Sequence, residues 1–142
     1  MTTTIPASTT TAVSDDRAGL GPIWRTGAIA GLVAAGAVTV VAALARALDV
    51  GLEVDGEAIP LAGFAQVTVI SVLIGLVLAS VLARRARHPQ AAFTRTTVAL
   101  TALSCVPSVL LPSETGARVA LVLTHLVAAA IVIPAVRDRL TR

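Results

Sequence analysis

One histidine, His125, lies inside the apolar run "RVALVLTHLVAAAIVIP" at residues 118–134. A polar side chain in such a run indicates a functional site or a hydrogen bond between helices, because hydrocarbon offers it no partner. An imidazole accepts a proton, binds a ligand head group or forms a hydrogen bond. Four more polar residues are candidates to act with it: Thr39, Gln66, Ser104 and Arg118.

These candidates share a depth along their apolar runs. His125, Gln66, Ser104 and Thr39 each lie six to eight residues from the outer end of a run. At a rise of about 1.5 Å per residue, they lie roughly 9–12 Å below that boundary. The spacing predicts one polar layer and a small outward-facing pocket. Arg118 lies two turns before His125, where it would attract an anion to the pocket mouth or extend its charge to interfacial water.

Two interpretations of His125 stay open at this point. In the structural one, a neutral imidazole donates to Ser104 or to the carbonyl of Leu103, which Pro107 deprives of its helical partner. Such a bond between membrane helices contributes about 0.6 kcal/mol on average. In the functional one, the polar layer lines a cavity, and His125 binds a ligand or accepts a proton.

The sequence argues against metal and catalytic chemistry. Cys105 is the one cysteine and only two histidines occur, so a zinc site or a redox cysteine pair is not expected. Ser104 and His125 could form a nucleophile and base, but no acidic residue inside the apolar runs would orient the imidazole. A small proton-coupled multidrug pump would also need such an acid. We therefore predict no metal, no cofactor and no catalytic residue.

Four helices must position these side chains. The chain of 142 residues is 56% hydrophobic and 13% charged, against about 25% charged in a typical soluble domain. Apolar runs of about 20 residues suffice to cross a bilayer. We predict an all-α, antiparallel four-helix transmembrane bundle, up-down-up-down, in a domain of residues 23–140 after a disordered tail at residues 1–22. The expected spans are residues 24–47, 60–83, 93–111 and 118–136.

The first span has a rival interpretation as a signal peptide cleaved near Ala45 or Ala47. Its apolar run is longer than the roughly 7–15 residues of a signal sequence, and a polar tail precedes it, so an uncleaved span is favoured.

Arginine predicts the orientation. All 11 basic residues are Arg, and nine belong to the N-terminal tail, the second connection and the C-terminal tail. The excess of positive charge on cytoplasmic segments places both termini in the cytoplasm of a multi-pass plasma-membrane protein. Nucleic acid is not an expected partner, because aromatic residues make up only 2% of the chain. Membrane lipid, a protein partner or a second copy of the chain remain as expected partners.

Small and hydroxyl residues form stripes at helical spacing. Gly27 and Gly31 form one pair, and a hydroxyl stripe comprises Thr97, Thr101, Ser104 and Ser108. A further stripe comprises Ser71, Gly75 and Ala79. These stripes favour close helix packing, with assembly of a pore through the Gly27 and Gly31 face as an alternative.

The connection at residues 46–59 carries Glu53, Asp55 and Glu57 at alternating positions. In an extended segment these acids would share one face. They would bind calcium weakly, meet a cationic partner or simply be solvated.

The segments "FTRTTVALTALSCVPSVL" and "LVLTHLVAAAIVIP" together resemble an uncharacterised actinobacterial family of small four-helix membrane proteins. The resemblance covers about residues 24–140 and depends on Phe93, Ser104, Pro107, His125 and Pro134. It implies the same fold and membrane location, and it brings no known activity.

The function that the sequence favours is therefore non-enzymatic, through interaction with a lipid or a partner. The alternative is a membrane-embedded enzyme or carrier for a hydrophobic small molecule, with His125 as proton acceptor.

Overall fold

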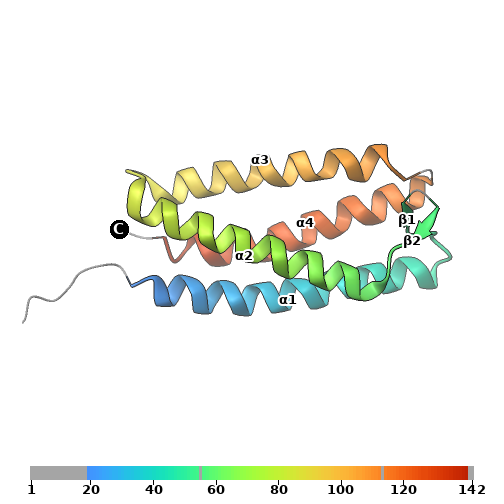
Figure 1. Ribbon diagram of the computed structural model, residues 1–142, viewed down its shortest axis with the longest axis horizontal. Coiled ribbons are helices and arrows are strands. Elements are labelled where there is room, and N and C mark those ends of the chain that lie inside the picture. Colours follow the sequence, from blue (N-terminus) through green and yellow to red (C-terminus); the bar gives the residue numbers. More distant parts are fainter. Residues whose placement is uncertain (1–18, 55, 113, 141–142) are drawn as a thin grey trace, which may run out of the picture.

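Four long helices make up almost all of the computed structural model, which describes residues 19–54, 56–112 and 114–140. The helices are α1 (Leu20–Ala47), α2 (Leu61–Arg85), α3 (Pro89–Leu110) and α4 (Thr115–Arg137), and they pack together into one bundle (Figure 1). Each is long and apolar enough to cross a membrane. The predicted all-α, four-helix fold is confirmed. Most of the predicted N-terminal tail, residues 1–18, lies outside the described residues.

Proline marks where the helices begin and end. The first helix starts at Leu20, so residues 20–22 of the predicted tail are helical. Pro22 is tolerated there because an N–H in the first turn has no partner within the helix. Pro60 directly precedes α2, and Pro89 is the first residue of α3.

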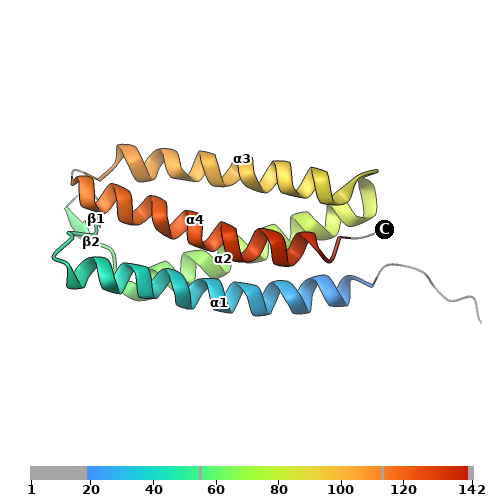
Figure 2. The same ribbon diagram turned by 180° about the vertical axis from the view of Figure 1, so that it is seen from behind.

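The two ends of the bundle differ in the segments that connect the helices there (Figure 1). The end that we call the hairpin end holds residues 48–60, between α1 and α2, and residues 111–114, between α3 and α4. The other, the terminal end, holds the start of α1, residues 86–88 and the end of α4. The two views agree that the first and last described residues lie at the same end (Figures 1 and 2).

A small antiparallel hairpin separates the acidic residues at the hairpin end. Strand β1 (Glu53–Val54) pairs with β2 (Glu57–Ala58), with Glu53 opposite Ala58 and Val54 opposite Glu57. Paired residues share a face and successive residues alternate, so Glu53 and Glu57 lie on opposite faces. The predicted single acidic face is wrong, because the chain reverses at Gly56, whose φ is 81°. Asp55 lies outside the described residues.

Small residues set the close approach of α1 to its neighbours. It packs most extensively against α4 and α2, whereas α3 packs mainly against α4. A side chain at Gly27 would overlap Leu76, and a Cβ at Gly31 would lie 2.8 Å from Val72 Cγ1. The glycine pair therefore packs against α2 of the same chain, and this face has no room for a second copy.

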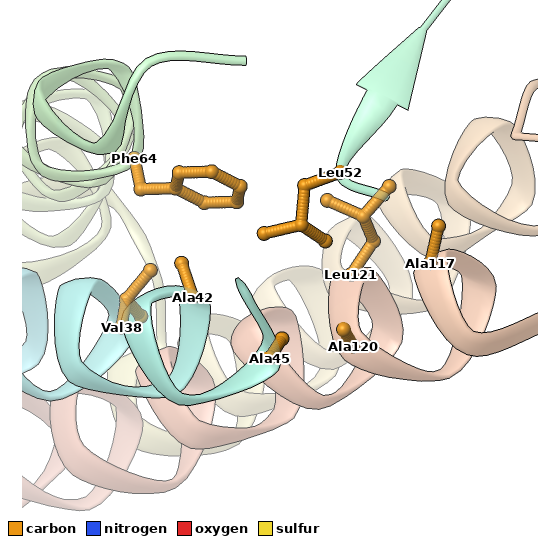
Figure 3. Close-up of a cluster of buried hydrophobic side chains, with 8 residues drawn as sticks. All are labelled: Val38, Ala42, Ala45, Leu52, Phe64, Ala117, Ala120 and Leu121. Carbon is orange, nitrogen blue, oxygen red and sulfur yellow. The ribbon is translucent and has the colours of Figure 1, made fainter. Parts of the chain in front are cut away.

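Two apolar clusters form the core. The cluster at the hairpin end joins α1, α2, α4 and the segment before β1, where the Phe64 ring and Leu52 point toward each other above the small residues of α1 (Figure 3). The cluster at the terminal end centres on Leu76 and Phe93, both almost fully buried. Away from these clusters the helices expose apolar side chains, among them Leu32 and Leu110 at 70% and 72%. Such flanks suit contact with lipid.

Candidate binding groove

A groove runs along the side of the bundle between α2, α3 and α4. Its volume is about 510 Å³, within the range of sites that hold small molecules. It exists because α2 and α3 meet at the terminal end, where residues 86–88 join them, and separate toward the hairpin end (Figures 1 and 2). The weaker packing between α2 and α3 agrees with this divergence.

Apolar side chains make up most of the groove wall. Its rim includes Val67 and Ile74 of α2, exposed at 63% and 62%, and Leu100 of α3, exposed at 50%. The groove therefore opens sideways between α2 and α3. Two buried aromatic residues, Phe64 and Phe93, also contribute to its lining.

Glycine at position 75 keeps part of the groove open. It lines the groove, and a Cβ built there would meet no atom within 4 Å. This contrasts with Gly27 and Gly31, where glycine permits contact between helices. The absent side chain at Gly75 instead leaves space that a ligand can fill.

His125 enters the groove from near the middle of α4. It is half-buried, and its Nδ1 lies 2.8 Å from the carbonyl oxygen of Leu121, one turn earlier. A carbonyl oxygen only accepts, so Nδ1 carries a hydrogen, and in the neutral form of the imidazole Nε2 then keeps a lone pair. The predicted bond to Ser104 or to the Leu103 carbonyl does not form, because the carbonyl of its own helix is within reach.

The second ring nitrogen of His125, Nε2, has no hydrogen-bond partner among the described residues. Within the described part of the chain no buried side-chain nitrogen or oxygen lacks a partner. The Nε2 atom is therefore not sealed off inside the protein, and it belongs to a side chain that lines the groove.

The hydroxyl stripe of α3 faces the same groove. Thr97, Thr101 and Ser104 line it, and each donates its hydroxyl hydrogen to a carbonyl of the preceding turn, at 2.7, 2.9 and 2.8 Å. Thr68 and Thr124, which also line it, do the same within α2 and α4. Because the hydrogens are used, these oxygens retain only acceptor capacity.

The other predicted site residues lie elsewhere. Gln66 is exposed and does not line the groove, although its neighbour Val67 does, because successive helical residues are about 100° apart. Thr39 donates to the carbonyl of Ala35 at 2.8 Å, outside the groove.

Arg118 is tied to the α3–α4 connection. Its Nε donates to the carbonyl of Pro112 at 2.9 Å, and it does not line the groove. The groove thus contains two of the five predicted residues, Ser104 and His125, and the four-helix polar layer does not assemble.

Residues 18–142 match the sequence model of a protein family, DUF6069, which is described as a family of unknown function. The chain belongs to the DUF6069 family. The match includes all four helices of this DUF6069 protein, and hence its whole groove. No curated protein matches the chain, and no solved structure does.

Several groove residues of the DUF6069 chain were missed as site candidates from sequence. They are Ser71, Gly75, Thr97, Thr101 and Thr124. The first four belong to stripes that were interpreted as packing surfaces, and the spacing of Thr97 and Thr101 from Ser104 was a usable signal. Thr124 is 5% exposed, and its position next to His125 was the only indication.

Among the described residues of this DUF6069 protein, no Asp, Glu or Arg side chain lines the groove. Across those residues, no three His, Cys, Asp or Glu side chains come close enough to hold a metal ion. Cys105, next to Ser104, is half-buried with a free thiol and does not line the groove. The groove offers hydrogen-bond acceptors on an apolar wall, a combination suited to binding.

Proposed function

We propose that this protein is a multi-pass plasma-membrane protein that binds a single-chain hydrophobic molecule in the groove between α2, α3 and α4. The observation that carries the proposal is the groove itself, about 510 Å³ of mostly apolar space on the side of a bundle of membrane-length helices. No reaction is required of it.

The proposed arrangement in the membrane is an antiparallel, up-down-up-down bundle with both termini in the cytoplasm. Its support is the distribution of Arg, nine of eleven residues in segments assigned to one side. The acidic hairpin would then face outward. We also propose an actinobacterial source, because the use of Arg without Lys and the abundance of Ala and Val fit a GC-rich coding bias.

The proposed occupant follows from where the groove opens. Its rim residues Val67, Ile74 and Leu100 belong to exposed apolar flanks of α2 and α3, which hydrocarbon would cover in a bilayer. A hydrophobic molecule would enter from the lipid without crossing water. In the groove its chain would exchange contacts with lipid tails for contacts with α2 and α3, which are equally apolar, so this exchange gives little selectivity. The shape and the polar groups of the groove would therefore decide which molecule binds.

Filling the groove tests the proposal. At Gly75 an added Cβ meets no atom within 4 Å, so the Leu side chain of Gly75→Leu starts in open groove space, and removal of a helical glycine favours folding. We expect saturable binding of tritiated hexadecyl methyl ether to the nanodisc-embedded protein to weaken about tenfold or more, because the occupant would have to overpack the site.

The matched control is Gly36→Leu. Gly36 also has open space around it, but it is exposed on α1 and does not line the groove. This variant should bind the probe as the wild type does. Equal binding by wild type, Gly75→Leu and Gly36→Leu would contradict the proposal, as would the absence of saturable binding to the wild type.

A carrier or enzyme that uses His125 as proton acceptor is the second candidate. The accessible Nε2 lone pair favours it, because a base needs that atom free while Nδ1 is held by a fixed acceptor. A protein partner or a second copy would have to use a surface other than the buried Gly27 and Gly31 face.

A further inference from the structure

The polar groups of the groove share one hydrogen-bonding character. The hydroxyls of Thr97, Thr101 and Ser104 donate to carbonyls of their own helix. Thr68 and Thr124 do likewise. Each of these hydroxyl oxygens therefore has only lone pairs left to offer a ligand. Ser71 is the exception among the described lining hydroxyls, since no such bond fixes its hydrogen, and it is exposed at the rim.

His125 has the same acceptor character. Because its Nδ1–H donates to the carbonyl of Leu121, Nε2 keeps a lone pair in the neutral imidazole, and the side chain that carries it lines the groove. The carbonyl of Leu121 also accepts the hydroxyl hydrogen of Thr124 at 2.7 Å. The shared carbonyl is thus satisfied by two donors of α4, which holds the imidazole in this orientation.

We infer that the occupant of the groove is an uncharged long-chain alcohol whose hydroxyl donates a hydrogen bond to His125 Nε2. This inference rests on the proposed function and specifies its ligand class. A hydroxyl at this depth has no water as partner, so an acceptor in the wall compensates for its burial. An ether or a ketone has no hydrogen to donate, and a carboxylate would meet acceptors at neutral His125 and at every described lining hydroxyl except that of Ser71.

The extent of the groove indicates a ligand with a long chain. The groove extends from Ile59 and Gly63 at the hairpin end to Phe93 and Val132 toward the terminal end, with His125 between them. An alkyl or isoprenoid chain attached to the hydroxyl would therefore lie along the groove, with its carbon atoms against α2 and α3.

The test compares two probes that differ in one hydrogen-bond donor. Tritiated hexadecanol and tritiated hexadecyl methyl ether are titrated onto the full-length protein in nanodiscs. The variant His125→Phe keeps a ring in place and removes Nε2. We expect it to weaken hexadecanol binding about five- to tenfold and to leave ether binding unchanged, because only the alcohol loses a hydrogen bond. For each probe we take the ratio of its affinities for the variant and the wild type, so its partition into lipid cancels, and the two ratios are then compared.

A second variant keeps the result interpretable if the ring substitution disturbs the fold. His125→Gln restores an acceptor, and it should recover most of the preference for hexadecanol over the ether. Parallel losses of both probes in His125→Phe, or no loss of either, would overturn the alcohol assignment. Binding of neither probe to the wild type, or insensitivity to Gly75→Leu, would instead overturn the proposed function.

Discussion

At the residue scale, two glycines of α1, Gly27 and Gly36, differ in what surrounds them. The Leu76 Cγ and both of its methyl carbons crowd the position where a Cβ of Gly27 would lie, whereas Gly36 meets open space. Gly27→Val should therefore lower the free energy of unfolding by about 1–3 kcal/mol, as overpacking of a tight contact does. Gly36→Val is the control, and equal stability of the two variants in detergent unfolding assays would contradict this packing. The double variant Gly27→Val with Leu76→Ala should recover part of the loss, since it returns volume to the contact.

At the element scale, one side chain ties the hairpin-end connections together. Glu114, directly before α4, accepts a hydrogen bond from the backbone N–H of Gly51 at 3.0 Å, and so links the segment before β1 to α4. We expect Glu114→Ala to reduce stability by about 0.5–1.5 kcal/mol, and Glu114→Gln, which keeps an acceptor oxygen, to lose less. Hydrogen exchange of the Gly51 amide measures the link directly. Unchanged protection in Glu114→Ala would show that the connection holds without it.

At the scale of the whole molecule, the charges predict a direction across the bilayer. Arg84, Arg85 and Arg87 lie at the terminal end, and Glu53 and Glu57 lie at the hairpin end. In a Cys105→Ser background, Glu57→Cys should react with a membrane-impermeant maleimide in intact cells, and Arg87→Cys only after permeabilisation. Labelling of Arg87→Cys in intact cells, with Glu57→Cys labelled only after permeabilisation, would show that the bundle has the opposite orientation. Labelling of both sites in intact cells would show that the chain does not span the membrane as proposed.

Much of the fold could be predicted from the sequence because membrane helices are specified locally. In a bilayer, a run of about 20 apolar residues has to form its backbone hydrogen bonds within itself, because lipid offers no partners. It therefore becomes a helix regardless of which other segments lie next to it. All four predicted spans correspond to helices, with boundaries that differ by a few residues. The hydroxyl stripe of α3 and the packing role of Gly27 and Gly31 follow from helical spacing for the same reason. The hairpin at Gly56 was missed, because two-residue strands leave too little pattern to read.

The groove, in contrast, depended on how the helices are rotated and tilted. Counting residues from the span ends placed Gln66, Thr39, Ser104 and His125 at one depth, but depth does not state which side of each helix faces inward. Contacts between segments distant in sequence fix the rotation of each helix, as the contact of Gly27 with Leu76 does for α2. In the resulting packing Gln66 is exposed and Ser104 lines the groove. The sequence by itself thus determined four membrane-length helices and their polar inventory. Only tertiary packing decided which polar atoms meet in one groove, because rotation about a helix axis is set by its neighbours.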